Sequence, residues 1–222
     1  MKKYSNDQLS KNLMKDICRT VAGLYSKELV LDVNMPSEKE GNGYIEITYS
    51  GKTSEKNILF DENASSDTIF DVLLKNNEYS ILLYDKSIIQ AEYLISDGRI
   101  TKGRLLFMKR HNRKWSLEEI SEMEEYEDSD WWKSQEGIPI VLRLDYDPDS
   151  FKEQYHSATH FTFSNCKSCR IPVRRLIPFS KFVKFILFHF YDIDFSVIPT
   201  EIMEDDTITE LERKMIHFDW MD

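Results

Sequence analysis

Two histidines and two cysteines lie close together in the second half of the chain. His156 and His160 are four residues apart, and Cys166 and Cys169 follow as a C-x-x-C pair. Imidazole and thiolate groups are the ligands that zinc takes in tetrahedral sites. Histidines that pack inside a core and cysteines in an exposed turn give the same pattern. We therefore expect no cofactor here, with zinc or another divalent metal as the alternative.

Three carboxylates stand at alternate positions just before these histidines, at Asp145, Asp147 and Asp149. Calcium loops begin in this way, but the glycine of their sharp turn is missing here. A looser divalent site would combine Asp145 or Asp147 with His156 and His160, as some hydrolases do. The simpler interpretation is a strand end followed by solvated acids in an Asp-Pro turn.

His160 and Thr162 form an H-x-T pattern. Two-histidine phosphoesterases use such a pair, with the histidine as general acid or base and the threonine on the phosphate. That chemistry needs two facing copies, and the chain has one. His160, His156 and Asp145 are nevertheless the candidate catalytic residues.

Basic residues are concentrated in two segments that contain no acid. Residues 99–114 hold seven lysines and arginines, and residues 165–184 hold six. If both segments lie on one face of a sheet, they predict a patch that binds phosphate groups. The candidate binding residues are Arg104, Arg143, Arg170, Arg174 and Arg175. Alternatively, the acidic segments 118–130 and 201–212, or an acidic partner, cover the basic ones.

The overall composition limits the classes of function. The net charge of −10 argues against a protein that coats nucleic acid, because such binding depends on displacing counterions from phosphates. Three cysteines, an odd number, are typical of a reducing compartment. The first residues lack the apolar stretch of a signal peptide, and charged residues interrupt the most apolar segment, 179–198. We expect a cytoplasmic protein, without a nucleotide-binding glycine loop or a serine or zinc hydrolase motif.

Hydrophobic periodicity predicts an α+β fold in a single domain, residues 1–222. A capping box at Ser5 and Gln8 precedes a helical pattern over residues 6–28. Asp97-Gly98 joins two alternating segments, which is typical of a tight hairpin. We expect one antiparallel sheet flanked by this N-terminal helix, a buried phenylalanine-rich helix over 178–191 and a C-terminal helix over 207–220. The other predicted elements are a polar loop at 36–42, a helix at 66–75, and strands at 44–49, 79–84, 89–95, 100–108, 138–144, 161–163 and 170–173.

Several short segments resemble the bacterial family catalogued as domain of unknown function 2290. They span about residues 80–192, and their order and spacing carry the resemblance. The segments are 85–93, 102–105, 143–147, the His156-x-x-x-His160 pair, the CRIPV segment 169–173, and 182–191. The resemblance implies that Arg143, Asp145, His156, His160 and Arg170 form a polar centre. Outside this family-like core, charge and apolar spacing predict an acidic helical tail, residues 200–222.

The family resemblance implies no established activity. It favours an accessory protein of a bacterial multi-gene system, such as anti-phage defence, that binds a protein partner encoded by a neighbouring gene. The adjacent Trp131 and Trp132 beside acidic sequence are typical of interface anchors, or of residues that pin a loop. The alternative is a protein that binds nucleic acid or acts on phosphodiesters, with His160 and the two basic segments in its site.

Overall fold

The computed structural model describes residues 4–49, 64–110, 139–163, 169–196 and 205–220. Helix α1, Asn6–Tyr25, begins as predicted: the Ser5 hydroxyl accepts a hydrogen bond from the Gln8 backbone N–H at 3.1 Å. The residues of its predicted apolar stripe, such as Leu13 and Ile17, are buried. Capping and periodicity together therefore define this helix.

The described residues form one antiparallel sheet of nine strands in the order β1-β4-β5-β6-β7-β8-β9, with β3 on β5 and β2 on β3. The start of β5 pairs with β4 and its end pairs with β3, so two strands share one edge of β5. The strands are β1 Val30–Val33, β2 Pro36–Gly41, β3 Tyr44–Tyr49, β4 Ile81–Leu83, β5 Ile88–Ser96, β6 Arg99–Lys109, β7 Ile140–Tyr146, β8 Thr159–Phe163 and β9 Arg170–Pro172.

The hairpin between β5 and β6 has the predicted turn. Asp97 and Gly98 both have positive φ, at 53° and 70°. This backbone matches the twist of the two strands that it joins, and it favours glycine at the second position.

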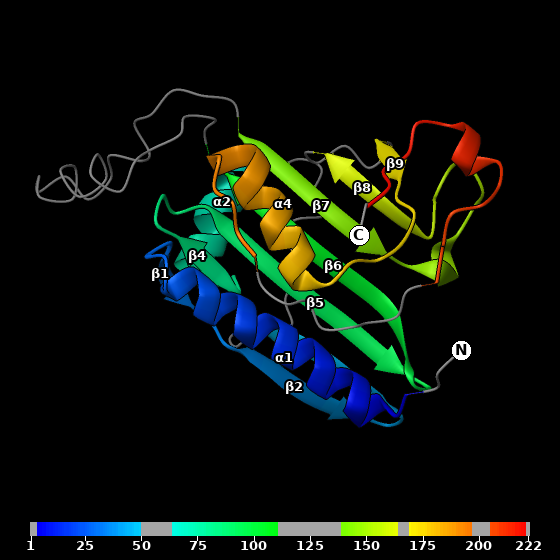
Figure 1. Ribbon diagram of the computed structural model, residues 1–222, viewed down its shortest axis with the longest axis horizontal. Helices are drawn as coiled ribbons and strands as arrows, with labels where there is room; N and C mark the ends of the chain where they lie inside the picture. The colour runs from blue at the N-terminus through cyan, green and yellow to red at the C-terminus, as the bar shows by residue number, and fades with distance from the viewer. Residues whose placement is uncertain (1–3, 50–63, 111–138, 164–168, 197–204, 221–222) are drawn as a thin grey trace, which may run out of the picture.

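Helices α1 and α4, Phe179–Tyr191, lie side by side on one face of the sheet (Figure 1). Phe107 of β6 contacts Phe190 of α4 with ring centroids 5.0 Å apart, and Phe161 of β8 stacks on Phe185 at 6.1 Å. Because successive side chains of a strand point to opposite faces, the intervening residues of β6, β7 and β8 face away from these helices. That second face carries the polar residues predicted for the site. The α+β class and the single sheet with flanking helices are confirmed.

Two buried polar contacts connect distant parts of this core. Asp16 of α1 accepts hydrogen bonds from the backbone N–H of Ser180, at 3.0 Å, and from its hydroxyl, at 2.7 Å. It therefore caps the first turn of α4 from outside that helix. Lys109 forms a buried ion pair with Asp85, which also accepts a hydrogen bond from the Tyr191 hydroxyl. The third helix, α2, Ser66–Lys75, binds Arg110 through Asp67 and Asp71.

Two predictions of secondary structure were wrong. Residues 36–41 form strand β2, paired with β3, rather than a loop. This strand lies at an edge and is mostly exposed, so its sequence shows no apolar alternation. Residues 207–220 do not form a helix, and contain only the 3-10 turn Glu212–Lys214. The backbone of Phe218 instead bonds to Pro172 and Arg174 beside β9, which leaves its amide unavailable for a helix.

Candidate functional site

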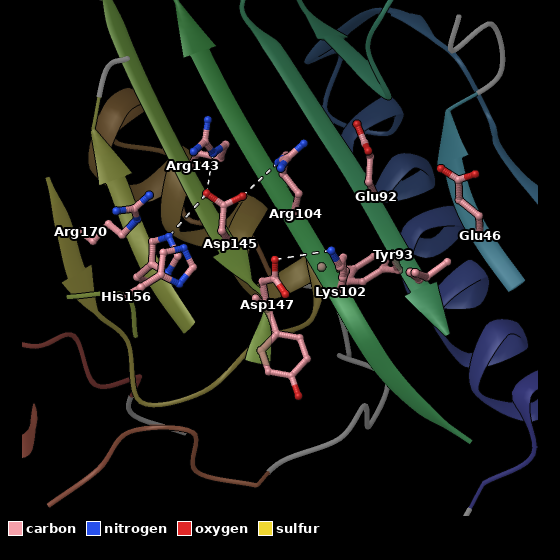
Figure 2. Close-up of a pocket in the computed structure, with 14 residues that line it drawn as sticks. Glu46, Glu92, Tyr93, Lys102, Arg104, Arg143, Asp145, Asp147, His156 and Arg170 are labelled. Atoms are coloured by element: carbon pink, nitrogen blue, oxygen red, sulfur yellow. Dashed lines mark hydrogen bonds and ion pairs between the residues drawn. The ribbon is translucent and has the colours of Figure 1, made fainter. Parts of the chain in front are cut away.

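A cavity of about 410 Å³ lies on the sheet face opposite α1 and α4 (Figure 2). Strands β3, β5, β6, β7, β8 and β9 contribute side chains to it, together with the loop that joins β7 to β8. This volume is in the range of small-ligand sites. Arg104, Arg143, Asp145, His156 and Arg170 from the sequence prediction all line the cavity, as does His160.

The register of four strands brings these residues together. In one row across the sheet, Arg104 of β6 lies opposite Asp145 of β7, which lies opposite His160 of β8. In the next row, Arg143 lies opposite Thr162, which lies opposite Arg170 of β9. Side chains opposite each other on one face of antiparallel strands lie within contact distance. The polar centre that the family resemblance implied is therefore one continuous surface.

Asp145 is held between two arginines. Arg104 donates from Nε to Oδ1 at 3.0 Å, and Arg143 donates from Nε to Oδ2 at 2.5 Å. Burial raises the pKa of Asp145, but the two guanidinium groups outweigh it, so the pKa of the carboxyl lies below its ordinary value. Asp145 is thus ionised at neutral pH. The three groups together carry two positive charges and one negative charge, a net charge of +1.

His160 lies beneath His156 at the side of this cluster. Its Nδ1 is 2.8 Å from the carbonyl oxygen of Ser157, so this nitrogen carries a proton and donates it. Its Nε2 is 3.9 Å from Oδ2 of Asp145. Burial is the main cause that lowers the pKa of His160, and the imidazole is neutral at neutral pH. The two histidine rings contact edge to face at 4.8 Å, and only His156 is partly exposed.

Among the described residues, several buried polar atoms at or beside the cavity have no hydrogen-bond partner. They include Nε of Arg170, Oγ1 of Thr162, Nδ1 of His156, Oδ1 of Asp147 and the Tyr93 hydroxyl. Arg170 also forms no ion pair with any carboxylate of the described chain. An unsatisfied buried polar group costs roughly 1–3 kcal/mol, so such groups are rare unless a ligand or an ion completes them. The donors of Arg170 and Thr162, which lie in one row with Arg143, point to an anionic ligand.

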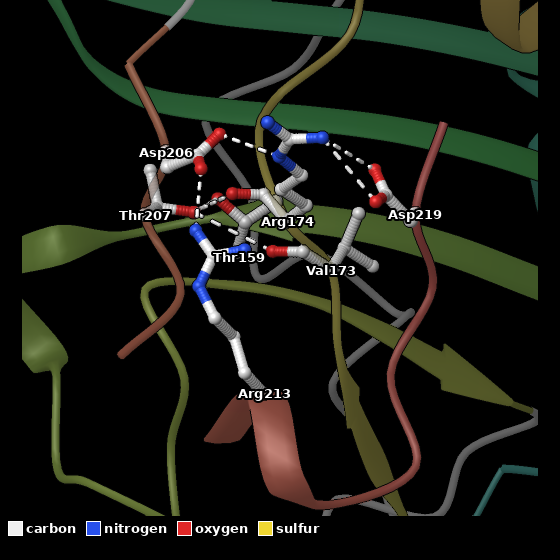
Figure 3. Close-up of polar contacts among 7 residues, drawn as sticks. All are labelled: Thr159, Val173, Arg174, Asp206, Thr207, Arg213 and Asp219. Carbon is white, nitrogen blue, oxygen red and sulfur yellow. Dashed lines mark hydrogen bonds and ion pairs between the residues drawn. The ribbon is translucent and has the colours of Figure 1, made fainter. Parts of the chain in front are cut away.

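Two predicted binding residues lie elsewhere. Arg174 binds Asp206 at 2.7 Å and Asp219 at 3.2 Å, both in the C-terminal segment (Figure 3). Arg175 does not line the cavity. Of the five candidate arginines, the structure therefore brings Arg104, Arg143 and Arg170 together at the cavity. The contact between Arg174 and Asp206 agrees with the alternative that acidic residues cover part of the basic sequence.

The first basic segment is likewise divided among different contacts. Lys102 lies 3.6 Å from Asp147 at the cavity, whereas Lys109 and Arg110 bind carboxylates elsewhere, as described above. The acidic segment 118–130 and the Trp131-Trp132 pair fall outside the described residues.

The donor set does not form a metal centre in the described part of the chain. No three His, Cys, Asp or Glu side chains there are arranged to hold a metal ion. Cys169 is exposed, and Cys166 lies outside the described residues. Nδ1 of His160 is already used by the Ser157 carbonyl.

Sequence reasoning missed several residues at or near the cavity, four of which carry polar side chains that bear on its chemistry. Glu46 and Glu92 line it from β3 and β5. Their alternation with apolar neighbours is a period-two signal that assigns them to the face away from the helices. Glu212 binds the hydroxyl of Ser157, whose carbonyl in turn binds His160. The spacing of Thr209 and Glu212 is a capping-box pattern, which is the sequence signal that could have identified Glu212.

Comparison with known families supports the resemblance found in the sequence. The profile of the family described as "Uncharacterized conserved protein (DUF2290)" matches residues 29–220, which extends from β1 to the C-terminal segment. No curated protein and no solved structure matches the chain. Because the profile covers most of the sequence, this protein belongs to the DUF2290 family.

Proposed function

We propose that this protein binds the phosphate group of a nucleotide or of a nucleic acid terminus in the cavity on its sheet. The observation that carries the proposal is the buried Nε of Arg170 beside the buried hydroxyl of Thr162, neither of which has a hydrogen-bond partner among the described residues. A phosphate oxygen would accept a hydrogen bond from each of them. Guanidinium groups match phosphate in both charge and geometry.

The charge of the arginine cluster supports an anionic ligand, whereas the cavity lining as a whole, with four cations and four carboxylates, is formally neutral. Arg104, Arg143 and Asp145 together carry +1, and Arg170 adds a further positive charge without an ion pair among the described residues. The partial burial of these groups strengthens their attraction for a phosphate, because the surrounding protein is less polarisable than water.

The size of the site and the charge of the whole chain favour a ligand of nucleotide size. A cavity of about 410 Å³ accommodates one nucleotide, whereas a chain with a net charge of −10 repels a long polyphosphate backbone. Nucleotides and nucleic acid ends present the same terminal phosphate, and a binding experiment separates these two sources.

Binding is a better assignment than acid catalysis by Asp145. Two arginines keep this carboxyl ionised, so it has no proton to donate at neutral pH. His160 is nearly fully buried, and His156 is the histidine placed nearer to a ligand. The residues predicted as catalytic are therefore proposed to shape the binding site.

Isothermal titration calorimetry tests this function. Orthophosphate, a nucleoside 5′-monophosphate and a 5′-phosphorylated oligonucleotide are compared with the nucleoside and with the unphosphorylated oligonucleotide. We expect binding of phosphorylated ligands only. Arg170→Gln should weaken it roughly tenfold or more, because a hydrogen bond to a charged group contributes about 1.5–3 kcal/mol.

Arg19→Gln is the matched control, since Arg19 is an exposed arginine of α1, on the opposite side of the sheet. Equal affinity of the two variants for phosphate, or equal binding of phosphorylated and unphosphorylated ligands, would refute the proposal.

Binding of a protein partner, within a bacterial multi-gene or anti-phage system, is our second proposal. It is supported by exposed apolar side chains on the C-terminal segment: Leu211, Met215 and Ile216, the last of which is 83% exposed. Co-expression with each neighbouring gene product and purification in pairs tests it. A specific complex that Ile216→Asp abolishes would support it, and the absence of any complex would count against it.

A further inference from the structure

The C-terminal segment, residues 205–220, is tied to the ends of β8 and β9 beside the cavity (Figure 3). Asp206 binds both Arg174, at 2.7 Å, and Arg213, at 2.5 Å. The Thr207 hydroxyl lies 2.7 Å from that of Thr159, the first residue of β8. We name residues 205–220 the C-terminal clamp.

Glu212 is the one residue of the clamp that is completely buried, with 0% of its surface exposed. Its Oε1 accepts a hydrogen bond from the Ser157 hydroxyl at 2.5 Å, and its Oε2 accepts one from the Thr209 backbone N–H at 3.0 Å. No cation of the described chain pairs with it. A buried carboxylate held by neutral donors is costly, which indicates a role beyond packing.

Ser157 connects this carboxylate to the cavity. Its side chain binds Glu212, while its backbone carbonyl accepts the Nδ1–H of His160 at 2.8 Å. A carbonyl at this position selects the imidazole tautomer with the proton on Nδ1. Nε2 is then an acceptor that faces Asp145, and it donates no hydrogen bond to that carboxylate.

We propose that Glu212 is a positioning residue of the cavity: through Ser157 it holds His160 in the Nδ1–H tautomer, so that Asp145 is left to the arginines. Besides Asp145, the charged or titratable groups that face His160 are His156 from the loop and Arg170 from β9. Without Glu212, the Ser157 carbonyl loses its anchor. The ring then adopts the other tautomer, and Nε2–H competes with Arg143 for Oδ2 of Asp145.

The tautomer is measured in ligand-free protein by long-range ¹H–¹⁵N correlation spectra of ¹⁵N-histidine-labelled samples, with His160 assigned by its loss in His160→Gln. We expect Nδ1–H in the wild type. Glu212→Ala and Ser157→Ala should both shift His160 toward the Nε2–H form. Glu210→Ala, a substitution of an exposed acid two residues away, should leave the spectrum unchanged.

A wild-type His160 with its proton on Nε2 would overturn the inference, whether or not any variant folds. So would a folded Ser157→Ala or Glu212→Ala protein whose His160 signals match those of Glu210→Ala. The consequence for ligands rests on the proposed function: Glu212→Ala should weaken phosphate binding up to about tenfold, the loss of one ordinary hydrogen bond. Wild-type protein that keeps the Nδ1–H tautomer but binds no phosphate would refute the proposed function and leave the positioning role intact.

Discussion

At the scale of single residues, the cavity combines groups that satisfy each other with groups that do not. The carboxylate of Asp145 is paired on both oxygens. Thr162, between Arg143 and Arg170 in the sheet, has a buried hydroxyl that finds no partner in the described part of the chain. Native proteins retain such groups where function requires them, at a cost in stability. Removal of such a group should therefore raise stability and weaken ligand binding at the same time.

Thr162→Val removes the unpartnered hydroxyl and keeps the shape of the side chain. We expect the free energy of unfolding, measured in urea, to rise by roughly 1 kcal/mol, because a buried orphan group is lost. We expect the affinity for phosphate to fall at the same time. A variant with lower stability would show that Thr162 has a partner in the folded protein.

Because two histidines are wholly or partly buried, we expect the free energy of unfolding to depend on pH. Burial lowers the pKa of both His160 and His156 below the ordinary value of 6.5, and His156 is the less buried of the two. As the pH falls through about 6.5, the unfolded chain therefore takes up protons before the folded chain does, and the folded state loses stability. Urea unfolding between about pH 7.5 and 5 should show this decline.

His160→Gln should flatten that pH profile, because the side chain with the larger burial no longer titrates. His189→Gln serves as the control, since His189 is an exposed histidine of α4. A decline as steep in His160→Gln as in the control would assign the dependence to other groups.

At the scale of elements, α4 depends on a cap that comes from another helix. Pro178 precedes α4 and its side chain offers no hydrogen bond, so Asp16 of α1 serves the N–H and the hydroxyl of Ser180. Negative charge is also favourable at a helix N-terminus. The contact holds α4 against α1, and the two helices together form the layer that packs on one face of the sheet.

Asp16→Asn should lower the free energy of unfolding by about 1–2 kcal/mol, as the loss of a good cap does, because the amide offers a single acceptor and no charge. Chemical denaturation followed by circular dichroism measures this change. The control is Asp194→Asn, which changes an exposed residue just beyond α4 and should alter the free energy of unfolding little. Equal effects of the two substitutions would contradict a capping role for Asp16.

At the scale of the whole molecule, a cluster of three arginines and one carboxylate with a net charge of +2 lies within a protein of net charge −10: Arg104, Arg143, Arg170 and Asp145. Such a distribution would confine the proposed phosphate binding to the cavity, because a surface of net negative charge repels polyanions. Nucleic acid coats behave differently, since each added phosphate contact releases a further counterion.

We therefore expect the affinity of 5′-phosphorylated oligonucleotides to be independent of their length. The slope of log K against log salt should be about −1, the value for a single neutralised phosphate. Fluorescence anisotropy over a range of salt concentrations measures both quantities. An affinity that grows with length, with a steeper slope, would indicate an extended nucleic acid surface instead.

Local patterns of residue type were sufficient to predict the elements wherever one face is buried. Period-two alternation located β3, β5, β6 and β7, and a 3.6-residue period with a cap located α1. The family resemblance, rather than a local pattern, marked Arg143, Asp145, His156, His160 and Arg170 as a set. The elements could be predicted because burial of one face leaves a regular pattern in the residue types of neighbouring positions.

Contacts between distant parts of the chain, in contrast, determine which cations line the site and which conformation the C-terminal segment adopts. The register from β6 to β9 places Arg104 with Asp145, while Arg174, four residues after Arg170, is held by Asp206 and Asp219. The apolar spacing of residues 207–220 favoured a helix, yet their backbone bonds to the end of β9. Pairings across such distances in the chain depend on which strand edge is free to accept a partner, and no local pattern of residue types records that.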